Sequence, residues 1–254
     1  MRFLLSALLG ATAATVPGFA QAPATAPADP AVVVDFSVRS GAYQVVGDVS
    51  LLSQRYSPGS TFEMIIAAVA LEAGEISGDT AIPPRSGGSS DGENPWTLPR
   101  ALRESHSDFF AQLLKRTGYD PVRKFLVESR YTPGIPEAIA SFAELARGEP
   151  LRVTVFEQNL FIQAFRKRDL PLQAEHCAAL ERWMALESPR SAWGKEGTGE
   201  VTGEPPRFVS WFNGVAPLRD GPHVITVAVL TPRRESVALS RFREYLAARR
   251  SPAS

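Results

Sequence analysis

A chain of 254 residues, 44% of them hydrophobic, is long enough for one domain with a substantial core. Its 27 basic and 27 acidic side chains balance, which argues against nucleic acid as a partner because nucleic-acid binders carry a basic excess. The one cysteine, Cys177, excludes an internal disulfide and, within a helical pattern, is interpreted as a buried structural thiol.

The N-terminus has the pattern of an export signal. Arg2 precedes an apolar stretch, Phe3 to Ala14, and small residues follow up to Gln21. This pattern predicts a signal peptide over residues 1–20 that is cleaved before Gln21, and hence an exported, periplasmic protein. We expect no membrane anchor, because no later run of about 18 apolar residues occurs.

The next residues divide into a linker and a domain. Residues 21–30 are rich in alanine and proline, which predicts a flexible linker, and one domain is expected over 31–254. Two valine-rich stretches with a turn between them predict a hairpin of strands at Val32–Val38 and Ala42–Val49. A helix is then expected over the apolar run from Met64 to Leu71.

A helical middle section and a second group of strands follow. Apolar periodicity predicts helices at Leu98–Thr117, Pro121–Glu128, Thr154–Lys167 and Leu172–Glu187, after a loop at Ser86–Pro95. Strands are predicted at Ser191–Val201, Phe208–Pro217 and Val224–Leu230, and a last helix at Arg234–Arg249. Strands at both ends predict an α+β fold of the α/β-sandwich type: an antiparallel five-stranded sheet flanked by helices, with a mostly helical lobe inserted.

The stretch from Ser57 to Glu63, just before the first apolar helix, is the first candidate site. A serine at a helix start lies beside unpaired backbone N–H groups that can stabilise an oxyanion, so Ser60 is a candidate nucleophile. The alternative for Ser60 on its own is a helix N-cap. Glu63 at position i+3 lies on the same helix face.

Several segments in order resemble those of the class D serine β-lactamases, over Val32 to Arg249. They are Pro58–Phe62, Trp96–Ser105, Phe109–Gly118, Pro150–Gln158, Gly194–Thr198 at the place of K-T-G, and Trp211–Gly214. Each match is weak alone, and their common order makes the resemblance specific. It implies the β-lactamase/transpeptidase-like fold and acyl transfer to Ser60 with hydrolysis of β-lactams.

The resemblance also implies roles for individual residues. Ser60 would attack the lactam, and the backbone N–H groups of Ser60 and Thr198 would stabilise the oxyanion. Ser105 would relay a proton across the cleft, and Lys195 would supply positive charge. Further ligand-binding positions would be His106, Ser107, Glu196, Gly197 and Arg234.

The chain departs from the family pattern at its general base. Glu63 replaces the lysine of S-x-x-K, which in class D carries a carbamate, and no tryptophan to hold a carbamate occurs between Trp96 and Trp183. Glu63 is also an anion, but it is shorter by roughly 3 to 4 Å, so we expect it to engage Ser60 only through a water. Burial should raise the pKa of Glu63.

Two further departures concern the ligand. Glu196 stands for the threonine of K-T-G, and its repulsion of a β-lactam carboxylate predicts poor binding of ordinary penicillins. We hypothesise that Arg234 pairs with Glu196. His106 follows Ser105 where an apolar residue is expected, and it is either a base or a solvent-facing helix residue.

These observations leave several functions open. One is a working hydrolase that uses Glu63 and water, or His106; the other main alternative is an inactive family member that binds a cell-wall fragment, a peptide or a protein. A sensor domain and a transpeptidase fit less well. The expected ligand is a β-lactam or a cell-wall peptide-like small molecule. No cofactor is expected, and no metal, because the three histidines show no ligand-like spacing.

Overall fold

The structure is a computed structural model that describes residues 29–83, 95–189 and 191–250. The expected signal peptide, residues 21–28 of the expected linker and most of the expected loop at Ser86–Pro95 lie outside these described residues. No helix within the described ranges is long and apolar enough to cross a membrane.

The main sheet is antiparallel and has five strands, as predicted, and the strand order is β2-β1-β7-β6-β5. Its strands are β1 (Ala31–Ser37), β2 (Tyr43–Gly47), β5 (Trp193–Val201), β6 (Arg207–Leu218) and β7 (Gly221–Thr231). The first and last strands of the chain meet at the centre, where Val34 of β1 pairs with Thr226 of β7. This pairing joins the two ends of the domain, and the inserted helices lie between them in sequence.

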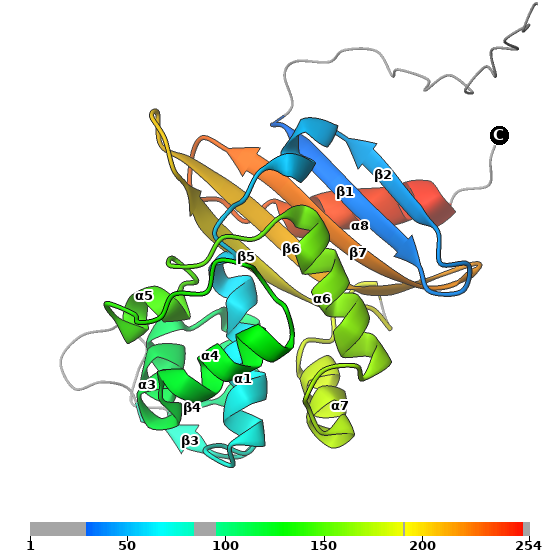
Figure 1. The fold of residues 1–254 in the computed structure, drawn as a ribbon. Coiled ribbons are helices and arrows are strands. Elements are labelled where there is room, and N and C mark those ends of the chain that lie inside the picture. The colour runs from blue at the N-terminus through cyan, green and yellow to red at the C-terminus, as the bar shows by residue number, and fades with distance from the viewer. Residues whose placement is uncertain (1–28, 84–94, 190, 251–254) are drawn as a thin grey trace, which may run out of the picture.

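Helices cover both faces of the sheet (Figure 1). One face carries α8 (Ala238–Arg250) and the other carries α6 (Val155–Lys167). Thr154 and Glu157 form a capping box at the start of α6, which fixes where this helix begins. Because both faces are covered, β7 is buried from His223 to Thr231.

The inserted lobe is mostly helical, as predicted. Its helices are α1 (Glu63–Glu72), α2 (Leu98–Glu104), α3 (Ser107–Thr117), α4 (Tyr119–Glu128), α5 (Phe142–Ala146) and α7 (Ala174–Trp183). Every residue of α1 from Glu63 to Leu71 is buried, because its side chains are apolar on all faces apart from Glu63. The shorter elements are η1 (Val49–Ser53), η2 (Gly59–Phe62), β3 (Ala81–Ile82) and β4 (Trp96–Thr97).

The predicted helix over Leu98–Thr117 is wrong in one respect, because the structure has two helices there. Ser105 adopts the left-handed conformation with φ 52°, which ends α2. His106 then caps α3, since its Nδ1 accepts a hydrogen bond from the backbone N–H of Phe109 at 3.1 Å. Ser105 therefore lies between the two helices and belongs to neither.

A buried polar cluster ties the two central strands to α8. His223 lies 2.6 Å from Asp35 Oδ1 through Nδ1 and 2.9 Å from Asp220 Oδ1 through Nε2. Tyr245 donates to Asp35 Oδ2 at 2.7 Å. The His223 ring thus bridges the carboxylates of Asp35 and Asp220, and Tyr245 adds a contact from α8.

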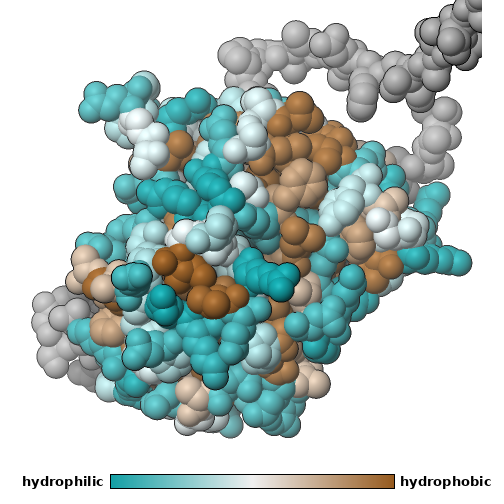
Figure 2. All heavy atoms as spheres, viewed as in Figure 1, coloured by the Kyte–Doolittle hydropathy of each residue, from teal (hydrophilic) through white to brown (hydrophobic). Residues whose placement is uncertain are grey.

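The face of the molecule in Figure 2 is largely hydrophilic, with separate hydrophobic areas. The exposed large hydrophobic side chains of the described residues are Tyr43, Val46, Val49, Val127 and Leu160. Three of these lie on or just after β2, which is an edge strand.

Candidate active site

Main-chain packing positions the Ser60 turn against the edge strand β5. A Cβ atom on Gly197 would lie 2.5 Å from the nitrogen of Thr61 and 2.9 Å from that of Ser60, so only glycine fits there. Gly59, with φ +56°, packs against the backbone of Thr198 in the same way. These contacts bring the Ser60 turn and the Lys195 strand together although the sequence separates them widely.

Side chains that the sequence analysis did not identify hold the same turn. Trp211 Nε1 donates to the Ser57 carbonyl at 2.8 Å, and Ser57 Oγ donates to the Gly148 carbonyl at 3.0 Å. Gln158 Nε2 donates to Thr61 Oγ1 at 2.9 Å. Trp211 and Gln158 lie in two of the segments that resemble the class D β-lactamases, which was a signal that they matter. The residues that they contact depend on the fold.

Ser60 and Glu63 lie within and directly after a tight turn. Ser60 is half-buried in the 3₁₀ turn η2, and Glu63 is the residue that ends this turn. Side chains three residues apart eclipse each other in a 3₁₀ turn. The Ser60 hydroxyl therefore lies beside the Glu63 carboxyl, and contact between them through a water stays a prediction.

Glu63 is fully buried and forms an ion pair with Lys195. Lys195 Nζ lies 3.0 Å from Glu63 Oε2, and the two side chains are 4% and 0% exposed. The groups around the Glu63 carboxylate are close to it but are not aligned for hydrogen bonding, because neither of its oxygens has a partner at hydrogen-bond geometry. The positive charge of Lys195 is thus compensated inside the protein.

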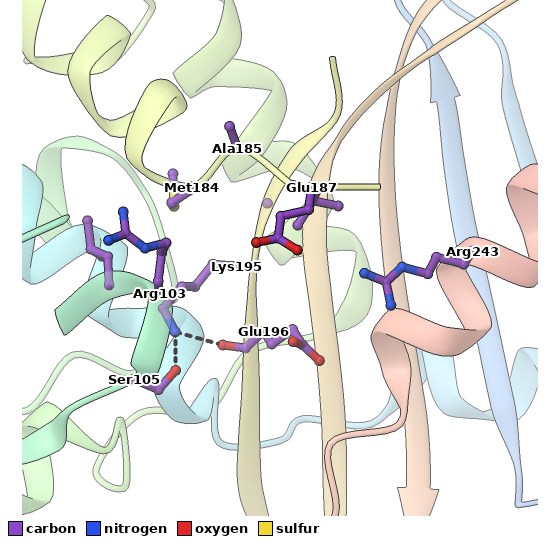
Figure 3. Close-up of a pocket in the computed structure, with 11 residues that line it drawn as sticks. Arg103, Ser105, Met184, Ala185, Glu187, Lys195, Glu196 and Arg243 are labelled. Carbon is purple, nitrogen blue, oxygen red and sulfur yellow. Dashed lines mark hydrogen bonds between the residues drawn. The ribbon is translucent and has the colours of Figure 1, made fainter. Parts of the chain in front are cut away.

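Ser105 completes this group. Lys195 Nζ donates to Ser105 Oγ at 2.5 Å and to the Glu196 carbonyl at 3.1 Å. The left-handed turn at Ser105 places its hydroxyl toward β5 (Figure 3). The structure therefore brings together all four predicted catalytic side chains, Ser60, Glu63, Ser105 and Lys195.

Burial raises the pKa of Glu63 to about 7, as the sequence analysis expected in direction. Desolvation is the largest cause, and the charge of Lys195 and the hydroxyls of Ser60 and Ser105 act in the opposite direction. The carboxyl therefore changes protonation near neutral pH. A group with such a pKa can accept a proton and release it again.

A pocket of about 260 Å³ opens beside Ser105 and Lys195, between the end of α2, the segment after α7, and β5. Its charged lining residues are Arg103, Glu187, Lys195, Glu196 and Arg243 (Figure 3). Among the predicted ligand-binding positions, Glu196 lines this pocket. Gly197 instead packs on the Ser60 turn.

The remaining predicted positions have other partners. Arg234 Nη2 pairs with Glu200 at 2.6 Å, and Glu196 Oε1 accepts from Ser236 at 2.7 Å, so the hypothesis that Arg234 pairs with Glu196 is wrong. Residues 196 and 200 lie four positions apart on β5. The loop before α8 places Ser236 beside Glu196 and Arg234 beside Glu200. These contacts leave ligand binding by Arg234 a prediction.

His106 has a structural role in addition to any role in binding. Its ring stacks on Trp96 at 3.8 Å between centroids, and its Nδ1 caps α3. Ser107 is the first residue of α3. Thr198 lies in β5 opposite Ser210, and its function as an oxyanion donor with Ser60 stays a prediction. The described residues contain no cluster of acidic, histidine or cysteine side chains that could hold a metal ion.

Comparison with known proteins identifies the family and the fold of the chain. A family model for the penicillin binding protein transpeptidase domain matches residues 38–246. No curated protein matches the chain. Among solved structures, a class D β-lactamase from Nostoc superposes with a TM-score of 0.76 at 20% identity, covering 87% of this chain and 93% of that one.

Two other structures extend the likeness. The class D β-lactamase FUS-1 from Fusobacterium nucleatum subsp. polymorphum has a TM-score of 0.73 at 17% identity, over 86% of this chain and 91% of that one. The C-terminal domain of the Bacillus licheniformis BlaR penicillin-receptor has a TM-score of 0.71 at 20% identity, over 85% and 91%. The chain belongs to the penicillin-binding protein transpeptidase domain family and has the fold of the class D β-lactamases.

Proposed function

We propose that this chain is an exported penicillin-recognising protein that accepts an acyl group on Ser60 and releases it slowly. The observation that carries the proposal is the buried carboxyl of Glu63, placed beside Ser60, Ser105 and Lys195. The ligand is a β-lactam or a cell-wall peptide-like small molecule. Export rests on the N-terminal sequence, and sequencing the protein recovered from the periplasm should give an N-terminus at Gln21.

The acylation step uses groups that the site contains. As Ser60 Oγ bonds to the lactam carbonyl carbon, its proton passes to the ionised carboxyl of Glu63. The carbon–nitrogen bond of the ring then breaks, and the nitrogen receives a proton from the Lys195–Ser105 pair. A carboxyl with a pKa of about 7 is well matched to the first transfer at neutral pH.

The same arrangement supports slow turnover. The ammonium of Lys195 that would favour the ligand's anion is already paired with Glu63 at 3.0 Å. Arg234 is engaged with Glu200. Glu196 adds a negative charge to the pocket beside Lys195. Transition-state stabilisation therefore loses much of its electrostatic contribution, which is often the largest one.

A second candidate function is binding without any covalent step, with a cell-wall fragment, a peptide or another protein as the ligand. The internal Glu63–Lys195 ion pair favours binding without acylation. Whenever Glu63 is ionised, Lys195 stabilises its negative charge, and this makes the carboxylate a weaker base toward Ser60. The two functions differ in one observable, a covalent adduct on Ser60.

The test is the intact mass of the mature protein after incubation with a panel of penicillins and carbapenems. We expect a persistent adduct in the wild type that is absent in Ser60→Ala and strongly reduced in Glu63→Gln. Ser53→Ala, which removes an exposed hydroxyl at the end of η1, is the matched control and should retain the adduct. No adduct in the wild type, together with saturable binding, would favour the second candidate.

A further inference from the structure

The Ser105 hydroxyl is presented by a residue in the left-handed conformation, with φ 52°. This conformation is unfavourable for a residue that has a Cβ atom, and it persists only where the surrounding structure enforces it. The Ala101 carbonyl accepts hydrogen bonds from the backbone N–H groups of both Ser105 and His106. The contacts of His106 therefore help to hold Ser105 in place.

His106 is tied to two elements directly after Ser105. Its Nδ1 and its carbonyl both accept from the backbone N–H of Phe109, at 3.1 and 3.0 Å, at the start of α3. Its ring stacks on Trp96 of β4 with 3.8 Å between centroids and an interplanar angle of 29°. Trp96 is itself buried, and the guanidinium of Arg100 lies 3.8 Å from its ring centroid. One imidazole thus joins α3 to β4 beside Ser105.

The cap fixes the protonation state of the His106 ring. A backbone N–H only donates, so the Nδ1 that accepts from Phe109 carries no proton. A protonated imidazole has N–H groups on both nitrogens and cannot accept at Nδ1. The stack on Trp96 tolerates a positive charge, because the face of an indole attracts cations. Protonation of His106 therefore breaks the cap and leaves the stack.

The surroundings of the His106 ring let its charge change with pH. The ring is half-buried, so protons reach it from the solvent. Its contact on β4 is the uncharged Trp96. Imidazoles are the side chains that commonly change charge between about pH 5 and 8. The charged groups on the elements around the ring are Arg100, Arg103 and Glu104 on α2, Asp108 on α3, and Lys195 on β5, which reaches the adjacent Ser105.

We infer that His106 is a positioning residue for Ser105: the neutral imidazole holds the Ser105 turn in the conformation that acylation needs, and protonation releases it. The inference rests on the proposed function, in which Ser105 and Lys195 give a proton to the leaving nitrogen. It also gives a role to the departure from S-x-V at this position. An apolar side chain could pack against Trp96 but could not cap α3.

The experiment measures how fast benzylpenicillin adds to Ser60 of the mature protein, by intact mass, at pH 5 and pH 8. The wild type is compared with His106→Asn, because asparagine is a strong N-cap that does not titrate. Both proteins keep Glu63, so the effect of its protonation cancels in the ratio of the two rates. We expect the ratio of the wild-type rate to the variant rate to fall about fivefold from pH 8 to pH 5, the factor that corresponds to one N-cap.

Two further variants separate the cap from other effects. His106→Phe keeps an aromatic ring for Trp96 but has no acceptor, so it should react about fivefold more slowly than His106→Asn at both pH values. His176→Asn is the control. His176 is another partly exposed histidine, it lies 2.7 Å from Glu72, and it does not line the pocket beside Ser105. The ratio of the His176→Asn rate to the wild-type rate should not change with pH.

A second measurement reports on the cap without any acylation. Hydrogen exchange of the Phe109 amide, followed by NMR, reports how often its hydrogen bond to His106 opens. We expect the protection of this amide to fall about fivefold from pH 8 to pH 5 in the wild type and to stay constant in His106→Asn.

A ratio of acylation rates that does not change with pH, or a Phe109 amide whose protection is the same at both pH values, would overturn the inference. An adduct with either of these results would leave the acyl transfer standing without the role of His106. No adduct at any pH would refute the proposed acyl transfer. A pH-dependent protection of Phe109 that is absent in His106→Asn would then still support the hold of His106 on the Ser105 turn.

Discussion

Replacing Glu63 with glutamine is expected to stabilise the protein at alkaline pH, although it removes a buried ion pair. At 3.0 Å and an effective dielectric constant of about 20, the attraction between Glu63 and Lys195 is about 5 kcal/mol. Desolvation of the fully buried carboxylate opposes it. Because burial raises the pKa of Glu63 to about 7 despite this attraction, desolvation is the larger effect.

The raised pKa links the stability of the wild type to pH. The folded protein holds a proton on Glu63 up to about pH 7, whereas the unfolded chain loses it near 4.5. The contribution of the protonated carboxyl is thus complete below pH 4.5 and is lost as the pH rises through 7. The loss is about 3 kcal/mol at pH 8, from the difference between the two pKa values.

Glutamine has the shape of the protonated carboxyl and does not titrate. We therefore expect Glu63→Gln to match the wild type near pH 4.5 and to exceed its free energy of unfolding by about 3 kcal/mol at pH 8. Urea unfolding of both proteins at the two pH values measures this. Glu200→Gln, an exposed carboxylate on β5, is the control and should change the unfolding free energy by less than about 1 kcal/mol.

A Glu63→Gln protein that is less stable than the wild type at pH 8 would refute the reasoning. It would mean that the ion pair outweighs the burial of its charges, and Glu63 would then be a permanent anion and a weak base.

Three further outcomes are expected. Gly197→Ala should abolish acylation of Ser60 and lower the melting temperature, because its Cβ would lie 2.5 Å from the Thr61 nitrogen, whereas Gly134→Ala, which has open space, should do neither. His223→Gln should lower the free energy of unfolding by about 2 kcal/mol in urea, because the buried Asp35 carboxylate loses the close contact that its Oδ1 makes with the His223 ring. Cys177 should react with a thiol reagent only after unfolding, because the side chain is buried and burial raises the pKa of the thiol.

The regular elements of the fold could be predicted because their patterns are local. The five strands of the main sheet and α1, α4 and α6 follow from valine-rich stretches and apolar periodicity, with boundaries within a few residues. The break at Ser105 could not be predicted in the same way, because residues 98–117 have a continuous helical pattern and a left-handed residue depends on tertiary contacts. The two-residue strands β3 and β4 are too short to show any period.

The candidate site could be predicted in its members but not in its contacts. The resemblance selected Ser60, Glu63, Ser105 and Lys195, and the structure places them together. The conformation that joins Ser60 and Glu63 is a 3₁₀ turn, which the sequence pattern does not distinguish from the first turn of an α-helix. The partner of Arg234 depends on how the loop before α8 lies on β5, and no sequence pattern encodes that position.

The contact between β5 and the Ser60 turn is made of main chain on both sides, with glycine at positions 59, 197 and 199. Its shape is fixed by atoms that every residue has, and it does not depend on which groups perform the chemistry. The main chain thus forms a fixed frame for the cleft. The side chain at position 63 can be exchanged within this frame while the Ser60 nitrogen stays in place.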